Sequence, residues 1–331
     1  MPNDALASRT RLRAAITSAV AGTAIFAAKM VAWHMTRSSA VLSDALESTV
    51  NVVAATFAVI AIRYAENPVD RDHPYGHGKI EHLAAAFEGG LITFAALLIA
   101  YQAIQVMIHG PEVKSIDVGL AVTAGAAVAN LALGAFVLRA GRRTASPTLV
   151  ADGIHILSDV WTTAGVLIGL GLVRLTGVLW FDPIAALLVG LFLAKTGAGL
   201  VRKAAGELLD REDPDLLRQL VDAFNEAKVP GLAGLHRLRA LRHGRQVHVD
   251  GHVFVPENWT VRQAHEALEA FERVVRDRTG LTAEIAFHLD PCHDPGCSGC
   301  SAEPCATRSA PFVASRPLTL EEACGPPPPH G

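Results

Sequence analysis

Residues 40–55 read AVLSDALESTVNVVAA, an apolar stretch that carries the carboxylate of Asp44 in its interior. A second stretch, residues 151–161, reads ADGIHILSDVW and places His155 and Asp159 in a similar setting. Carboxylate and imidazole groups are costly in hydrocarbon, so they usually face a bundle interior or a water-filled path. Their presence in two separate apolar stretches therefore predicts a cation site between helices.

The composition around these stretches is that of a membrane protein. Half of the 331 residues are apolar, and only 18% are charged. A soluble domain carries about a quarter charged residues. The apolar residues form six blocks, each near the roughly 20 residues that cross a bilayer as a helix. We predict spans at residues 14–35, 40–63, 84–108, 117–139, 148–174 and 178–201. The first block is too long for a cleavable signal peptide.

Basic residues set the expected orientation of these spans. One set of loops and ends carries Arg9, Arg11, Arg13, Arg63, Arg71, Lys79, Arg139, Arg142, Arg143, Arg202 and Lys203. The opposite set carries Arg37, Lys114 and Arg174. The positive-inside bias therefore predicts a multi-pass protein of the cell inner (plasma) membrane with both termini in the cytoplasm. No basic tract points to nucleic acid, and no phosphate-binding loop of the form GxxxxGK[ST] points to a nucleotide.

After about residue 205 the chain takes on the character of a soluble domain. An amphipathic helix to about residue 228 is followed by strands at 236–241 and 246–255, with a hairpin turn at 242–245. A second helix is expected at 261–278 and a third strand at 283–289. The order αββαβ favours a compact α+β module with two helices over one face of the sheet. The remainder is rich in Cys, Pro, Ser and Gly, which predicts disorder.

Three motifs in order resemble the cation diffusion facilitator family, in particular bacterial zinc and ferrous-iron efflux transporters. They are SDALES at 43–48, DRDHPYGHGK at 70–79 and ADGIHILSD at 151–159. The resemblance covers residues 12 to about 292. It implies a membrane all-α six-helix transmembrane bundle followed by a cytoplasmic α+β, ferredoxin-like domain, in a homodimer. The expected layout is a cytoplasmic N-terminus at 1–13, a transport domain at 14–204, a metal-binding dimerisation domain at 205–292 and a disordered Cys/Pro-rich tail at 293–331.

The candidate transport site combines both apolar stretches. Residues four apart on a helix project from nearly the same face, so His155 and Asp159 can chelate one ion while Asp44 contributes from the other helix. Nitrogen and oxygen donors of this kind suit tetrahedral Zn²⁺.

The fourth ligand is open. The family resemblance points to Ser48, where the bacterial efflux relatives often carry a second carboxylate. Glu47, Asn51 or a water molecule are the alternatives. Asp152 is interpreted as a cap of the fifth span, and Glu88 and Asn130 as packing or pathway groups.

Two further clusters suggest cytoplasmic metal sites. The loop after the second span carries Asp70, His73 and His77, which can form a small site and match family positions. The cytoplasmic domain carries a larger set, which the resemblance implies is a binuclear zinc site at the dimer interface. Its members are His236, His252, His265, His288 and Asp290. The resemblance also implies a charge interlock between Lys79 and Asp210.

These ligand types predict divalent metal efflux by proton-coupled antiport. A protonated imidazole cannot bind metal, so metal and protons compete for the same groups. The ion is both substrate and structural or regulatory ligand, and Zn²⁺ is favoured over Fe²⁺, Cd²⁺, Co²⁺ and Ni²⁺. Ser48 favours an alternative, a non-transporting metal-sensing or partner subunit. The sequence contains no HExxH or similar motif of the kind that a membrane metalloenzyme would carry, so we do not expect an enzyme.

All five cysteines lie near the C-terminus, at positions 292, 297, 300, 305 and 324. A reducing cytoplasm argues against disulfides. The segment CSGC at 297–300, with Cys292, His293 and Cys305 nearby, resembles a thiolate metal clip. The alternative is a disordered tail without a function.

Overall fold

The computed structural model describes residues 2–36, 39–110, 117–227, 229–243, 246–279, 283–292, 297, 300, 305–306, 308–314 and 316–326. The chain divides into two compact units, Met1–Leu209 and Asp210–Gly331. Each unit has a hydrophobic core of its own.

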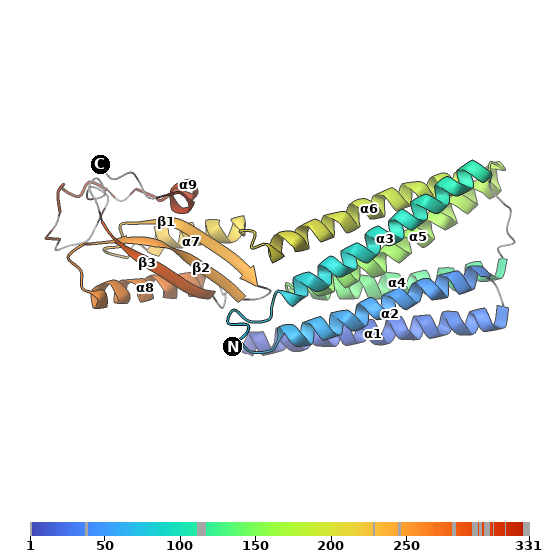
Figure 1. Ribbon diagram of the computed structural model, residues 1–331, viewed down its shortest axis with the longest axis horizontal. Coiled ribbons are helices and arrows are strands. Elements are labelled where there is room, and N and C mark those ends of the chain that lie inside the picture. Colours follow the sequence, from blue (N-terminus) through green and yellow to red (C-terminus); the bar gives the residue numbers. More distant parts are fainter. Residues whose placement is uncertain are drawn as a thin grey trace. The chain divides into compact units, whose positions relative to one another are not determined.

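The described part of the first unit contains six long helices that lie side by side (Figure 1). They are α1 (Pro2–Thr36), α2 (Ser39–Ala65), α3 (Ile80–His109), α4 (Asp117–Arg143), α5 (Pro147–Thr176) and α6 (Phe181–Leu208). Each predicted span falls within one helix, except that α6 begins at Phe181 rather than at 178. By length and composition, described stretches of α1, α2, α3, α4 and α6 could each cross a membrane. Large apolar side chains such as Phe94 and Leu188 are exposed on these helices, as lipid contact requires.

Helix α5 carries candidate metal ligands and packs closely on α4. A Cβ atom at Gly153 would lie 2.7 Å from the Leu138 nitrogen, and one at Gly141 would lie 2.7 Å from the Val150 nitrogen. These distances are shorter than real Cβ contacts, so the two backbones can approach this closely only because both positions are glycine. Small residues at helix interfaces allow such close packing in membranes. The two helices are therefore in close contact over about one turn of each, residues 138–141 and 150–153.

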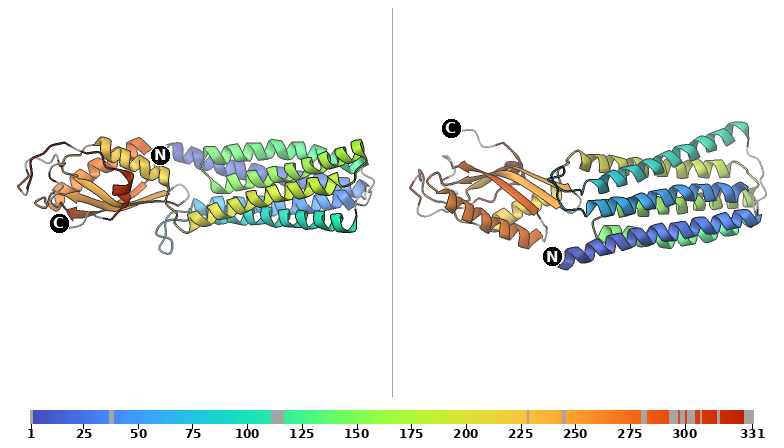
Figure 2. Two further views of the ribbon diagram at one scale, coloured as in Figure 1. Left: turned by 90° about the horizontal axis from the view of Figure 1, so that it is seen from above. Right: turned by 60° about the horizontal axis from the view of Figure 1, so that its bottom comes forward.

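The second unit begins with the predicted αββαβ order, which confirms the fold class. Its elements are α7 (Pro214–Ala227), β1 (Gly234–His243), β2 (Gln246–Val255), α8 (Val261–Thr279) and β3 (Ala283–Pro291). Strand β1 pairs antiparallel with β2, and β2 pairs parallel with β3 (Figure 2). The predicted hairpin turn at 242–245 is shorter than expected because β1 continues to His243, and residues 244–245 lie outside the described residues.

The core of the second unit lies between the sheet and its helices. In α7, the leucines and valine that the periodicity predicts are buried, and Phe224 contacts Phe271 of α8 with ring centroids 5.4 Å apart. The strands add alternate residues to the same core: Leu235, Leu238, Ala240, Val247, Val249, Val253, Val255, Ile285, Phe287 and Leu289. Because side chains alternate across a strand, the residues between them lie on the opposite face of the sheet.

One part of the C-terminal segment, residues 316–326, contains regular structure that its composition does not predict. Within residues 316–326, a short helix α9 (Leu320–Cys324) begins at a capping box between Thr319 and Glu322. The side chain of Asn225 on α7 exchanges hydrogen bonds of 2.9 and 2.7 Å with the backbone of Leu318. The few apolar residues of this segment pack against the core of the second unit, and this packing fixes an otherwise polar stretch.

The α4–α5 contact predicts different effects on stability for two glycine-to-alanine changes. Gly153→Ala should destabilise the protein by about 1–3 kcal/mol, because the new methyl group meets the α4 backbone. Gly125→Ala in α4 is the matched control, since no atom lies within 4 Å of the place its methyl group would take, and it should leave stability unchanged or raise it slightly. Thermal unfolding of the detergent-purified variants measures the difference. Equal stabilities would contradict the close approach.

Candidate metal centres

Helices α2 and α5 bring Asn51 between His155 and Asp159. The Oδ1 atom of Asn51 lies 2.8 Å from Nε2 of His155, and its Nδ2 atom donates a hydrogen bond to Asp159. We name these three residues the membrane cluster. His155 and Asp159 are presented by one face of α5, as their spacing predicts.

The hydrogen bonds of the membrane cluster determine which imidazole nitrogen is open to a metal. The carboxylate of Asp159 can only accept, so the amide nitrogen of Asn51 faces it and the amide oxygen faces His155. A neutral His155 must then donate from Nε2. Its Nδ1 atom is buried and makes no hydrogen bond within the described part of the chain. The lone pair on Nδ1 is therefore the one that a cation can reach without displacing Asn51.

Ser48, to which the family resemblance points as the fourth ligand, contacts Lys29 rather than His155 or Asp159. It is buried on α2, and its hydroxyl accepts a 2.8 Å hydrogen bond from the ammonium of Lys29 on α1, which is also buried. Sequence reasoning missed Lys29, although a lysine inside an apolar span is itself a signal of function. Asp44 and Glu47 lie on α2, but their side chains are outside the described residues.

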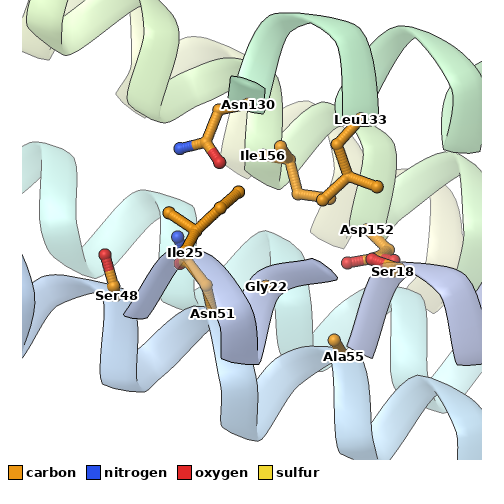
Figure 3. A pocket seen from close by; sticks show the side chains of 10 residues that line it. All are labelled: Ser18, Gly22, Ile25, Ser48, Asn51, Ala55, Asn130, Leu133, Asp152 and Ile156. Carbon is orange, nitrogen blue, oxygen red and sulfur yellow. The ribbon is translucent and has the colours of Figure 1, made fainter. Parts of the chain in front are cut away.

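A small cavity adjoins these groups (Figure 3). Its volume of about 10 Å³ is near the minimum that holds one water molecule. Ser48, Asn51 and Asn130 line one part of it, while Ser18 and Asp152 line another. The cavity therefore lies between Asn51 of the membrane cluster and Asp152.

Asp152 is not the helix cap that the sequence suggests. Ser146 caps α5 instead, because its side chain accepts from the Leu149 nitrogen and Pro147 occupies the first turn. Asp152 is 1% exposed and Glu88 on α3 is 0% exposed. Both carboxylate oxygens of Glu88 lack a hydrogen-bond partner among the described residues, while Asp152 has the Ser18 hydroxyl as its neighbour. Bare buried carboxylates are too costly to persist, so these groups require a proton or a cation.

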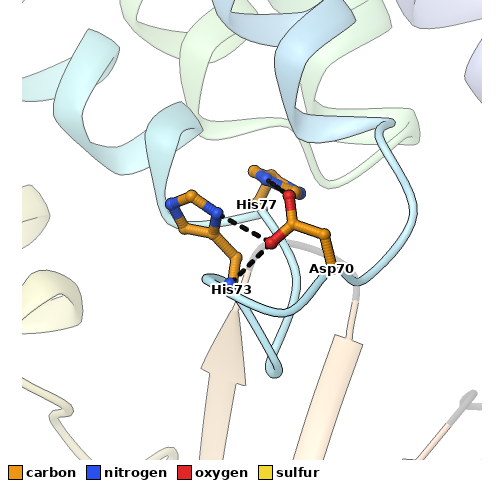
Figure 4. Close-up of side chains that lie close together, drawn as sticks. All are labelled: Asp70, His73 and His77. Atoms are coloured by element: carbon orange, nitrogen blue, oxygen red, sulfur yellow. Dashed lines mark hydrogen bonds and ion pairs between the residues drawn. The ribbon is translucent and has the colours of Figure 1, made fainter.

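The loop between α2 and α3 brings Asp70, His73 and His77 together, and we name them the loop cluster (Figure 4). The Asp70 carboxylate lies 3.1 Å from Nδ1 of His73 and 3.3 Å from Nε2 of His77. The backbone N–H of His73 donates to the same carboxylate and lowers the pKa of Asp70. Three donor atoms within 4.8 Å of one another suit one metal ion.

A row of histidines crosses the sheet of the second unit. His236, His252 and His288 are direct partners on β1, β2 and β3, on the face opposite the core. Asp290 lies on the same face, 3.2 Å from Nε2 of His236, 3.0 Å from Nδ1 of His252 and 3.4 Å from Nε2 of His288. We name these four residues the sheet-row cluster.

The sheet-row cluster is electrostatically prepared for a cation. Burial lowers the pKa of His236, which keeps the imidazole neutral at pH 7. Burial alone would raise the pKa of Asp290, but the hydrogen bond and charge of His252, with His236 and His288, lower it. A neutral imidazole and an ionised carboxylate are the forms that bind metal.

His265 is not part of this row. It lies on α8, where it pairs with Glu269 at 3.4 Å. Because α8 covers the opposite face of the sheet, His265 could complete the set only from a second copy of the chain. Lys79 and Asp210 belong to different units, so their interlock stays a prediction.

Comparisons with known proteins agree with this architecture. The family model for the cation efflux transmembrane domain matches residues 15–209, and that for the cation efflux protein cytoplasmic domain matches residues 213–292. The chain is 36% identical over 283 residues to the uncharacterized transporter sll1263 of Synechocystis, covering 85% of this chain and 90% of that protein. It is 31% identical over 286 residues to the cation-efflux pump FieF of Salmonella schwarzengrund, covering 85% and 92%. With both domain models matched in order, the chain is a multi-pass membrane protein that belongs to the cation diffusion facilitator (cation efflux) family.

Proposed function

We propose that the protein exports a divalent metal ion, with Zn²⁺ as its main substrate, in exchange for protons. Asp44, His155 and Asp159 are the proposed transport ligands. The observation that carries the proposal is that α2 and α5 meet through a hydrogen-bonded imidazole, amide and carboxylate inside an apolar bundle. Such groups have no structural need for one another in lipid, where apolar residues would pack at lower cost.

The donor set supports Zn²⁺ as the leading substrate. Imidazole nitrogen with carboxylate oxygen suits Zn²⁺, and Fe²⁺, Cd²⁺, Co²⁺ and Ni²⁺ accept the same donors. We propose that Asn51 orients the two α5 ligands, because it contacts both, and that Ser48 is a poor fourth ligand, because its hydroxyl accepts a hydrogen bond from Lys29.

Proton coupling is supported by the buried titratable groups of the bundle. Metal and protons compete for His155 and Asp159, so protons loaded from outside can displace the metal. Glu88 lies buried without a hydrogen-bond partner in the described chain, Asp152 has the hydroxyl of Ser18 beside it, and a proton is the simplest way to hold both carboxyl groups there. Proton entry would thus drive metal exit.

The second unit supports a homodimer. Its match to the cytoplasmic domain of cation efflux proteins favours dimerisation, and His265 lies where it could complete the sheet-row cluster of a partner. Metal in this cluster would link two copies and respond to cytoplasmic metal load. We propose that both termini lie in the cytoplasm and that the bundle lies in the cell inner membrane, which the distribution of basic residues supports.

Zn²⁺ uptake into proteoliposomes tests the transport proposal. A pH gradient should drive uptake by the natural protein, and Asp159→Ala should lower the initial rate at least about tenfold because a metal ligand is lost. Thr176→Ala, at the exposed end of the same helix, is the matched control and should transport normally. Full uptake by Asp159→Ala would refute the transport site and favour a sensing role.

The amide bridge predicts a second effect. Asn51→Ala removes both hydrogen bonds that orient His155 and Asp159, and loss of such support weakens metal affinity about 10–100-fold. We expect the KM for Zn²⁺ to rise by that factor. Asn130→Ala, which lines the same cavity from α4, should change KM much less. An unchanged KM in Asn51→Ala would show that the bridge has no part in metal binding.

Substitution of a sheet-row ligand should remove metal from the second unit and leave the membrane cluster unchanged. His252→Ala in the full-length protein should lower the Zn²⁺ content by about one ion per chain, since it removes a central nitrogen ligand. His248→Ala is the control, because His248 lies on the same strand and pairs with Glu284 at 3.2 Å. Elemental analysis after dialysis measures the content. Equal content in the two variants would count against this site.

A further inference from the structure

Four of the five cysteines line one cavity beside the sheet of the second unit. Cys292, Cys297, Cys300 and Cys305 surround it, together with Ala233, Pro256 and Arg308. The fifth, Cys324, lies apart from it in α9. All five are free thiols. The cavity volume is about 10 Å³, which leaves room for one water-sized occupant.

Hydrogen bonds hold the thiols around this cavity. The Cys292 backbone N–H, just after β3, donates to the Val255 carbonyl at 2.8 Å, which ties the first thiol to the end of β2. The Cys300 N–H donates to the Cys297 carbonyl at 3.3 Å, which ties these two cysteines to each other. Cys297 and Cys300 are each 9% exposed.

Arg308 binds the backbone of the same two cysteines. Its guanidinium donates to the Cys297 carbonyl at 3.2 Å and to the Cys300 carbonyl at 3.1 Å. A side chain that binds the carbonyls of both cysteines holds their backbones close to each other. It also brings a positive charge to a place where thiolates would gather.

The four thiols lie near enough to influence one another. Burial raises the pKa of the Cys292 thiol, and Cys297, Cys300 and Cys305 raise it further, against a hydrogen bond from the Glu257 backbone. Several thiolates in one place repel each other unless a cation lies between them. Among the described residues, the groups whose donor atoms all lie within 4.8 Å of one another do not include these thiols. An ion would therefore have to draw the sulfur atoms inward, to a sulfur–metal distance of about 2.3 Å for Zn²⁺.

We propose that Cys292, Cys297, Cys300 and Cys305 form a tetrathiolate site for one thiophilic divalent ion, Zn²⁺ by preference. The ion would join the C-terminal segment to the end of β3 in the second unit. A four-cysteine set with a C-x-x-C pair is a common structural zinc arrangement. Binding releases four thiol protons and leaves a net charge of −2 on the metal centre, which the guanidinium of Arg308 partly offsets. The family match ends at residue 292, so three of the four ligands lie beyond it.

Cobalt(II) titration of the full-length, detergent-purified protein tests the site. With the thiols reduced by a phosphine and air excluded, Co²⁺ should give the thiolate-to-metal charge-transfer absorption and strong visible bands of a tetrahedral sulfur site. Zn²⁺ should abolish them. All cysteines of the chain lie in this region, so the charge-transfer signal reports on these thiols even when Co²⁺ also occupies histidine and carboxylate sites.

Cysteine variants complete the test. Cys324→Ser is the matched control and should keep the full signal, while Cys297→Ser with Cys300→Ser should reduce it to background. Retained Zn²⁺ binding at the sheet-row cluster will show that the double variant still folds. The proposal is overturned if the natural protein gives no charge-transfer signal, or if the double variant keeps it. Fewer than five free thiols in protein purified without reductant, again with no signal, would assign the cysteines to disulfides instead.

Discussion

A polar side chain within an apolar helix bundle must find its partner on a neighbouring helix, because lipid offers none. Asn51 meets this requirement for two groups at once, since its amide satisfies the imidazole of His155 and the carboxylate of Asp159. The same requirement explains why the ammonium of Lys29 lies against the Ser48 hydroxyl. The arrangement of α1, α2 and α5 therefore follows from where their polar residues can be satisfied.

The sequence predicts the elements of the fold well because the signals for them are local. Long apolar blocks identify the helices of the first unit, and a change of hydrophobic period identifies α7, α8 and the three strands. The loop cluster follows from short spacing within one segment. The sheet-row histidines are also accessible to prediction, since each lies on a strand, but their alignment depends on a pairing register that no single strand encodes.

What the sequence leaves open depends on how helices are rotated against each other. Ser48 and Asn51 lie three residues apart on α2, and a small rotation decides which of them meets α5. Hydropathy does not resolve that rotation, so Asn51 stays one of several alternatives until the helices are placed. Two other features escape for different reasons. His265 lies on a helix behind the sheet, and the composition of the tail conceals the few apolar residues around α9 that pack on the core.

The alternation of side chains along the strands separates two kinds of chemistry in the second unit. Apolar residues such as Val253 and Phe287 face the helices, and the histidines next to them face away. A shift of one residue in the pairing of β2 with β3 would exchange the two sets. Core packing and the placement of the metal ligands are thus enforced by the same register.

The Asn51 bridge also has a mechanical consequence. The glycine contacts pack α4 and α5 closely together, so we expect a path to the membrane cluster to open by α2 sliding or tilting against that pair. Such a movement must break both hydrogen bonds of Asn51. A cation that binds Asp159 competes with the Asn51 amide for that carboxylate, and so weakens one of the two bonds that resist the movement through which the cation would leave.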